Sequence, residues 1–420
     1  MIHKLKLLFT DKSLRKRIFF VLGAFVVLRL LATIPIPGVD KNQLASFLAN
    51  NQFFGLLNVF SGGGLSTLSI VMLGVGPYIT ASIIMQLLTL MVPSLKEMNQ
   101  EGGEAGRKKF AQYTRLLAVP LALIQGFSLL ALLGSQGVIV DASIFTKVVN
   151  LIIVTAGSML MVWIGELISE FGIGNGISLI IFAGIVARLP SEVSQMLFTY
   201  NASNLPLYIL FLVIGLLVIA GVVLITEAER PVAVTYARQS RGMSTSSGVT
   251  TYVPLRLNMA GVIPIIFALS ILLFPQIFSN LFANSSHAWL HSLAATLAKF
   301  TQTSLLYGVL YFVLVFVFTY FYTSVTFDPK QMSENLQKNG AFVPGIRPGD
   351  STTTYISNIV SRITLVGGLF LAVIAVLPLI VRSLSGITSL ALGGTALLIV
   401  VSVIIDLLKK IDAQTSMREY

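Results

Sequence analysis

The stretch LPLYILFLVIGLLVIAGVVLIT, from Leu205 to Thr226, decides the fold class of this chain. Its 22 residues contain no Asp, Glu, Lys or Arg, and a helix of about 20 apolar residues crosses the hydrocarbon core of a bilayer. The whole chain of 420 residues follows the same pattern, because 55% of it is apolar and only 11% is charged, against about 25% in soluble domains. This composition excludes a soluble protein and predicts an all-α integral membrane protein.

Ten apolar runs predict ten transmembrane helices, which together would absorb nearly all the apolar residues of the chain. The runs are Ile18–Pro35, Leu68–Val92, Leu116–Gly134, Val148–Ile168, Ile177–Leu189, Leu205–Thr226, Met259–Phe278, Ser304–Phe327, Tyr355–Val381 and Ile387–Leu408. The fifth run is too short to cross a core of about 30 Å unaided. We therefore expect it to lie inside the helix bundle.

The positive charges are unevenly divided between the two sides that ten crossings create. Because the number of crossings is even, both termini lie on one side, and the segments on that side carry 22 of the 28 Lys and Arg residues, against 5 on the other. The positive-inside rule then predicts that both termini are cytoplasmic. A net charge of +11 would suggest nucleic acid in a cytosolic protein, but here its distribution indicates topology, and we expect no DNA partner.

The ten predicted helices fall into two sets of five, in residues 1–190 and 205–420, which an external loop at residues 191–204 connects. Since five is odd, the second set enters the membrane with opposite polarity, as in an inverted repeat with a path between its halves. Two basic cytoplasmic loops, at about 227–258 and 328–357, are long enough to suggest docking of a partner. The alternative is that their charges only set the topology. Their candidate residues are Arg238, Arg241, Arg256, Lys338 and Arg347.

Residues Asn50 to Leu68 read NNQFFGLLNVFSGGGLSTL, which is too polar to span a membrane and too apolar for an exposed loop. Three successive glycines, Gly62 to Gly64, disfavour a long helix, while the phenylalanines favour burial. The segment at about 55–68 is therefore predicted to be a short mobile helix held within the protein. The alternative is a helix that lies on the outer membrane surface.

Two isoleucine pairs, Ile79 with Ile83 and Ile177 with Ile181, have the spacing that places both members on one helix face. On composition alone they are ordinary packing residues. Polar residues within or beside the spans are either the lining of a path or interhelical hydrogen-bonding groups. They are Thr80, Gln86 and Asn258.

The patterns that would indicate an enzyme or a cofactor are missing from the sequence. There is no cysteine and no P-loop, and the pair His287 and His291 lacks the glutamate of a zinc protease motif. Asp350 lies in a loop, without a second membrane Asp for an intramembrane protease. The spans contain almost no ionisable residue: Arg29 lies toward the outer end of its helix, and Glu166 lies at a cytoplasmic edge. The relays of carboxylates or histidines that ion-coupled transporters use are therefore not expected. We expect no enzyme, no metal and no cofactor.

Eight blocks in the right order resemble the SecY family, which forms the channel of the bacterial Sec translocon, and the resemblance covers nearly the whole chain. The blocks are PIPGVD (35–40), FSGGGLSTLSI (60–70), GPYITASIIMQLL (76–88), EGGEAGRKKFAQYTR (101–115), GIGNGISLIIFAGIVARLP (172–190), PLRLNMAGVIP (254–264), KNGAFVPGIRPG (338–349) and GGTALLIVV (393–401). The resemblance implies an hourglass channel between two inverted halves in the bacterial cytoplasmic membrane. It also implies that SecE clamps the channel and that a SecG-type subunit lies at its periphery.

By their positions in these blocks, particular residues would take the functional roles of the family. A ring of aliphatic side chains would form the constriction: Ile79, Ile83, Ile177, Ile181, Ile266 and Ile399. A plug between Asn58 and Leu68 would seal the outer funnel, with Asn58, Phe60, Ser61, Gly62, Gly63, Gly64 and Leu65 among its residues. Spans two and three, with spans seven and eight, would form the lateral gate that opens to lipid, where Thr80, Gln86 and Asn258 lie.

The resemblance also implies the partners and the substrate. The two cytoplasmic loops would dock the SecA motor and the ribosome, and Arg347 would be the arginine on which SecA coupling depends. After Tyr236 to Arg238 the first loop has fewer basic residues than is common in the family, so weaker contact with ribosomal RNA is expected. The implied function is the translocation of unfolded, signal-peptide-bearing preproteins. The alternative class is an inverted-repeat secondary transporter of small solutes.

Overall fold

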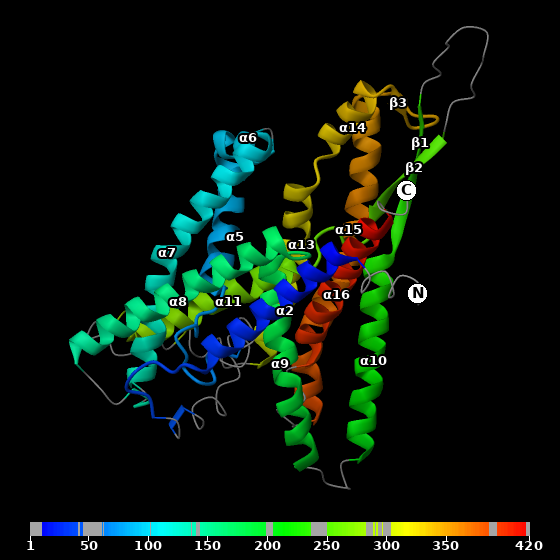
Figure 1. Ribbon diagram of the computed structural model, residues 1–420. Helices are drawn as coiled ribbons and strands as arrows, with labels where there is room; N and C mark the ends of the chain where they lie inside the picture. Colours follow the sequence, from blue (N-terminus) through cyan, green and yellow to red (C-terminus); the bar gives the residue numbers. More distant parts are fainter. Residues whose placement is uncertain are drawn as a thin grey trace, which may run out of the picture.

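The computed structural model describes residues 11–40, 43–44, 61, 63–100, 102–135, 137–139, 143–198, 205–236, 250–282, 289, 291–292, 296, 304–385 and 393–416. This part of the chain is mostly helical, and a helix lies in each of the ten predicted spans (Figure 1). These helices are α2 (Lys12–Thr33), α5 (Gly76–Met91), α7 (Gly103–Ser135), α8 (Ile144–Phe171), α9 (Gly176–Phe198), α10 (Leu205–Glu227), α11 (Ile263–Phe282), α13 (Ser304–Thr326), α15 (Asp350–Ser385) and α16 (Gly393–Ser416). Two shorter helices are α6 (Pro93–Gln100) and α14 (Pro329–Lys338).

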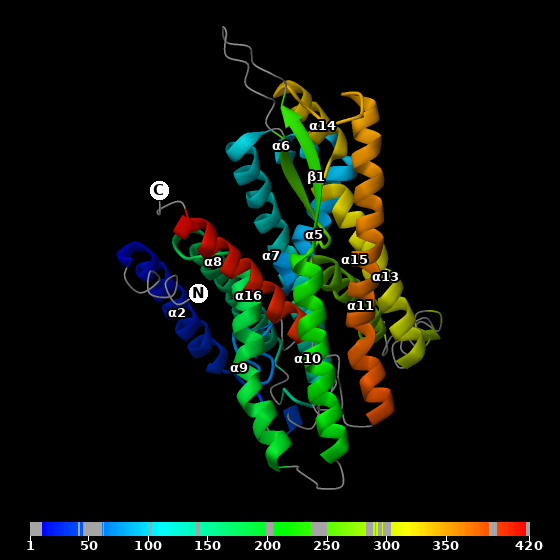
Figure 2. The ribbon, with the colours of Figure 1, turned by 90° about the vertical axis from the view of Figure 1, so that its right-hand side faces the viewer.

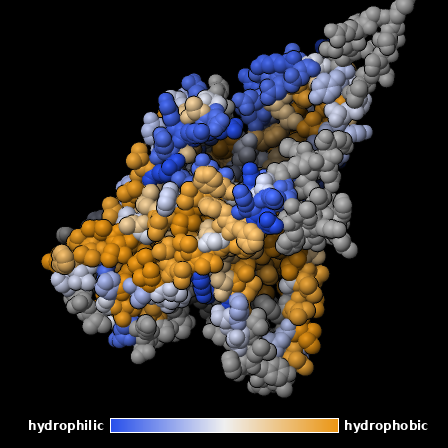
Figure 3. Space-filling view, viewed as in Figure 1, coloured by the Kyte–Doolittle hydropathy of each residue, from blue (hydrophilic) through white to orange (hydrophobic). Residues whose placement is uncertain are grey.

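Five helical segments of the described chain are long and apolar enough to cross a membrane. A sixth is added if α5 and α6, which are bent by 114° relative to each other, act as one span. Apolar side chains form a broad band across the face of the molecule, and hydrophilic side chains gather above it over α6 and α14 (Figure 3). The protein is therefore a multi-pass membrane protein.

The two sets of helices meet on two sides of a large hydrophobic core. On one side α11 packs against α5 and α7, and on the other side α9 packs against α16. Within the second set, α13 and α15 lie side by side along most of their length (Figure 2). The beginning of α2 and the end of α16 are also joined, because Leu14, Ile173 and Ile411 form a small buried cluster.

Helix α10 is the most exposed of the long apolar helices. Only 12% of its apolar segment Tyr208–Glu227 is buried, against 50% of Ile144–Phe171 in α8. Leu212, Leu217 and Leu224 are among its exposed side chains. Such a helix is stable in lipid, where exposed apolar side chains carry no solvation penalty.

One element departs from the all-helical expectation: a three-stranded antiparallel sheet in the order β2-β1-β3, beside α14. Its strands are β1 (Glu229–Tyr236), β2 (Thr250–Arg256) and β3 (Ala341–Phe342). Val232 pairs with Val253, and Thr235 with Phe342. The sheet therefore joins the two long loops into one structure. The charges of the loops did not predict this arrangement. The local signal was the alternation around Val232 and Val234, both of which are buried.

Candidate functional site

Four helices bring the six predicted pore isoleucines into one hydrophobic cluster. Ile79 and Ile83 come from α5, and the next pair comes from the short helix α9. Ile266 on α11 and Ile399 on α16 belong to the same cluster. Four of the six are buried, whereas Ile177 and Ile266 are partly buried. Residues separated by more than 300 positions in sequence thus share one aliphatic centre, although their role as a pore ring stays a prediction.

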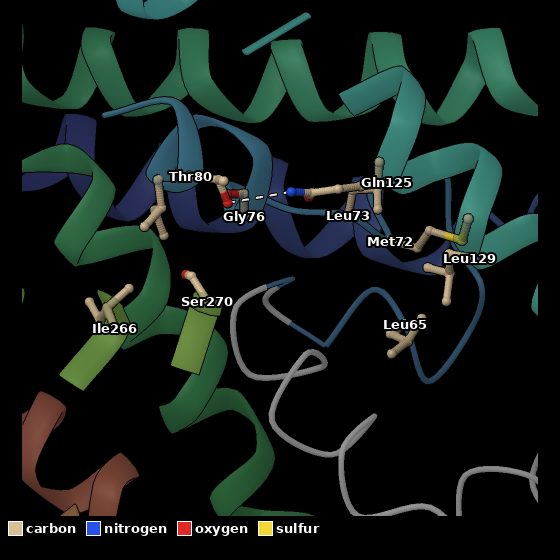
Figure 4. A pocket seen from close by; sticks show the side chains of 10 residues that line it. Leu65, Met72, Leu73, Gly76, Thr80, Gln125, Leu129, Ile266 and Ser270 are labelled. Carbon is tan, nitrogen blue, oxygen red and sulfur yellow. Dashed lines mark hydrogen bonds between the residues drawn. The ribbon is translucent and has the colours of Figure 1, made fainter. Parts of the chain in front are cut away.

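A small cavity of about 40 Å³ lies beside this cluster (Figure 4). Ile79, Ile266 and Leu65 of the plug segment are among the residues that line it. A water molecule needs roughly 10–15 Å³ of such space, so the cavity has room for about two or three. Its remaining lining residues are Met72, Leu73, Gly76, Thr80, Gln125, Leu129 and Ser270.

The polar contact in this cavity joins two helices. The Gln125 Nε2 atom on α7 donates a hydrogen bond of 3.3 Å to Thr80 Oγ1 on α5, as Figure 4 shows. The Thr80 hydroxyl itself donates to the carbonyl of Gly76 at 3.1 Å. The sequence reading selected Thr80 but missed Gln125, although an amide within the apolar run Leu116–Gly134 was a signal for an interhelical hydrogen bond.

The other two predicted gate residues make separate, local bonds. Gln86 donates to Ser82 Oγ one turn earlier in α5, and Asn258 donates to the carbonyl of Gly261, each at 3.3 Å. In both residues the side-chain oxygen is buried and has no hydrogen-bond partner within the described chain. A buried acceptor without a partner costs free energy. The three predicted gate residues therefore do not form one network in this structure.

The described part of the plug segment consists of turns and not of the predicted helix. Ser61 and Leu65 are almost fully buried, and the Leu65 N–H donates to Ser61 Oγ at 3.1 Å. The turns continue to Val75, so α5 begins at Gly76 and not near Leu68. The physical reason is the backbone, because Gly63, Leu68 and Gly74 all have positive φ angles, which an α-helix excludes. The predicted plug residues Asn58, Phe60 and Gly62 lie outside the described residues.

The predicted docking residues fall on the sheet and on the turn beside it. Arg256 ends β2, and its Nε atom lies 3.5 Å from Glu229 Oε1 on β1. Lys338 is the exposed last residue of α14. Arg347 is exposed at the turn between β3 and α15, where its carbonyl accepts a hydrogen bond of 2.9 Å from Thr352 Oγ1. Two further predicted residues, Arg238 and Arg241, lie outside the part that the structure describes.

The turn that carries Arg347 is held by contacts on both sides. The Ser333 hydroxyl on α14 donates to the carbonyl of Gly349 at 2.9 Å. Val343 is buried in the same cluster as Val232 and Ile356, and Ile346 packs against that cluster. An exposed arginine on a fixed backbone is well placed for recognition, because less conformational entropy is lost when a partner binds it.

The fold and the site together define a multi-pass helical membrane protein with an aliphatic centre between its helices and a polar helix-and-sheet structure at one end. A family model described as SecY matches residues 69–408. The protein translocase subunit SecY of Mycobacterium bovis is 40% identical to this chain, and the similarity covers 97% of the chain and 96% of that relative. The chain belongs to the SecY family.

Solved structures agree with this fold. One is the structure of a SecY protein, which superimposes on this chain with a TM-score of 0.65. In that SecY protein the plug domain stabilises the closed state of the translocation channel and maintains a membrane seal. That protein is 16% identical in sequence, and the match covers 97% of this chain and 93% of that chain. Canine Sec61 in a ribosome–channel complex from the endoplasmic reticulum matches with a TM-score of 0.62 at 16% identity, over 97% and 94% of the two chains.

Proposed function

We propose that this chain is the pore-forming subunit of a protein-conducting channel, which translocates unfolded preproteins and releases apolar segments sideways into lipid. The observation that carries the proposal is the 40% identity to a protein translocase subunit SecY over 97% of the chain. The aliphatic centre agrees with it, because an apolar constriction resists water and ions by dewetting. It also offers no specific bonds that would trap a passing polypeptide.

We infer a topology of ten spans in two inverted halves, residues 1–190 and 205–420, around an hourglass pore in the bacterial cytoplasmic membrane. Support comes from the helix in each predicted span and from the apolar band of Figure 3. The sheet, α14 and α6 then lie at the cytoplasmic end, where the charge distribution also places both termini. Residues 191–204 form the external hinge in this topology, and the docking loops occupy about 227–258 and 328–357.

The pore ring in this proposal consists of the six isoleucines, and the plug closes the outer funnel against it. Leu65 supports the arrangement, because it lines the same cavity as Ile79 and Ile266. Opening of the gate separates α5 and α7 from α11 and α13. A segment inside then partitions by hydrophobicity: each Leu gains about 0.3–0.6 kcal/mol at the membrane centre, whereas each Lys or Asp costs about 2.5–3.5 kcal/mol.

The proposed partners dock on the rigid structure formed by the sheet, α14 and the Arg347 turn. SecA and the ribosome use this cytoplasmic surface and supply the driving force, so the channel itself catalyses no reaction. SecE clamps the helices from outside, and a SecG-type subunit lies at the periphery. The apolar side chains of α10 are exposed, so they can contact either lipid or such a subunit.

The positions of the ionisable residues do not support the alternative, a small-solute transporter. Ion-coupled transport uses ionisable groups near the membrane centre. The described residues of the predicted spans include two carboxylates, and each lies near the end of its span. Glu166 on α8 contacts Arg115 on α7 at 2.8 Å, and Asp406 on α16 contacts Lys410 at 3.1 Å. Both carboxylates are therefore ion-paired, and neither lies near the membrane centre.

The test is reconstitution of this chain with SecE in vesicles, followed by addition of SecA, ATP and a radiolabelled preprotein. We expect protease-protected preprotein only when SecA and ATP are both present. Omission of ATP is the control for passive entry. Absence of protected preprotein in fully supplied vesicles, together with uptake of a small solute without SecA, would favour the transporter.

A further inference from the structure

Residues 67–75, which we name the plug root, connect the plug segment to α5. Two backbone hydrogen bonds join the root to the chain that follows α2: the Ile36 N–H donates to the Leu68 carbonyl at 2.9 Å, and the Ile70 N–H donates to the Ile34 carbonyl at 3.0 Å. The Thr67 hydroxyl adds a third bond, of 2.6 Å, to the carbonyl of Ala32. One side of the root is therefore fixed to the end of α2.

The conformation of the root depends on these surroundings. Leu68 has a φ angle of +42° and is fully buried. A left-handed backbone is costly for a residue with a side chain, and such a conformation persists only where neighbouring contacts hold it. Without those contacts, Leu68 would relax and the root would change its path.

The second side of the root rests on α8. The Ser158 hydroxyl, which is fully buried, donates to the carbonyl of Gly74 at 2.8 Å. One residue earlier, Gly157 lies so close to the root that a Cβ on it would overlap the carbonyl oxygen of Ile70 and lie 2.7 Å from its carbonyl carbon. Only a glycine allows this approach of the two backbones.

A third contact of α8 stabilises the neighbouring chain. The amide of Asn150, which is 1% exposed, donates to the carbonyl of Pro37 at 3.3 Å. Asn150, Gly157 and Ser158 are spaced at i, i+7 and i+8, so they lie on one face of the helix. This face of α8 therefore contacts both the plug root and the segment that pairs with it.

We propose that Gly157 and Ser158 are positioning residues for the plug. They fix the root, so that residues 67–75 keep their position when the channel opens and Leu65 returns to one defined closed position. The consequence at the pore is direct, because Leu65 lies two residues before the root and lines the cavity with Ile79 and Ile266. This inference rests on the proposed function for its effect on sealing, but the anchoring of the root is testable by itself.

The experiment uses the full chain with SecE in vesicles and exploits the absence of cysteine from the sequence. A single cysteine replaces Ser69, which is fully buried in the root. The test variants are Gly157→Ala and Ser158→Ala, and the matched control is Gly215→Ala in α10, where a Cβ meets nothing within 4 Å. The measurements are the maleimide labelling rate of the cysteine, the ion leak without preprotein, and preprotein transport with SecA and ATP.

Gly157→Ala should raise the labelling rate and the resting leak by about 10-fold or more, because its methyl group displaces the root. Ser158→Ala removes one buried hydrogen bond and should raise both by roughly 2- to 10-fold. Gly215→Ala should change neither, and all three variants should still transport preprotein.

Labelling and leak at the level of the Gly215→Ala control in both α8 variants would overturn the proposal. If Gly157→Ala does not fold, the milder Ser158→Ala decides by the same criteria. If even the unsubstituted channel fails to transport preprotein, the proposed function fails, while the labelling rates still decide whether α8 anchors the root.

Discussion

Replacement of Ile181 by Asn distinguishes a pore-lining isoleucine from an ordinary core residue. Ile180 is the matched control, because it is adjacent to Ile181 on α9 and belongs to the same cluster. Both side chains are buried: Ile181 is 2% exposed and Ile180 is 1% exposed. They point in different directions, since successive helix positions differ by about 100°. The Cδ1 atom of Ile180 lies 3.1 Å from the position of a Cβ on Gly165, so Ile180 packs against α8.

The two substitutions should have different costs. Loss of a buried aliphatic side chain forfeits about 1.5–3 kcal/mol at either position. An amide buried without a partner costs a further 1–3 kcal/mol or so. At position 180 both costs apply, and the free energy of unfolding should fall by about 2.5–6 kcal/mol. If Ile181 lines the proposed pore, water reaches the amide at position 181, so only the first cost of about 1.5–3 kcal/mol applies.

The assay combines thermal unfolding of the purified complex with ion flux through vesicles that contain it. Ile181→Asn should make the constriction easier to wet, so it should raise ion flux in the absence of preprotein while keeping most of the stability. Ile180→Asn should show the larger loss of stability and no added flux. Equal losses of stability, with the flux unchanged in both variants, would place Ile181 in a closed core and refute the pore ring.

Three further predictions concern the docking turn, the gate and the helix packing. Arg347→Glu should lower SecA-driven transport by at least about 10-fold while the channel still inserts into the membrane; unchanged transport would remove this arginine from the docking surface. A double-mutant cycle of Gln125→Leu and Thr80→Val should give a coupling energy of about 0.5–1.5 kcal/mol in thermal unfolding, and additive effects would argue against their hydrogen bond. Gly176→Ala should destabilise the protein by about 1–3 kcal/mol or more, because a Cβ there would lie 2.7 Å from the carbonyl carbon of Gly165. A melting temperature equal to that of the Gly215→Ala control would contradict this packing.

The helices could be predicted from sequence, whereas some of their ends could not. Long apolar runs such as Leu205–Thr226 are helical because only a helix satisfies every backbone group within one segment in lipid. The run from Leu68 was different, since α5 starts at Gly76 after a series of turns. A left-handed leucine is rare, and the contacts that hold Leu68 come from residues near position 35, so local sequence gave no sign of it.

The amino-acid sequence by itself determined that this is a membrane protein, where its helices lie, and which family motifs it carries. These properties are local, because hydrophobicity and helix length are read along one segment. Only the tertiary structure decided that Gln125 meets Thr80, that two charged loops form one sheet, and that Gly157 touches the carbonyl of Ile70. Such contacts depend on how each helix is rotated and packed against distant neighbours, which the side chains of both partners set together.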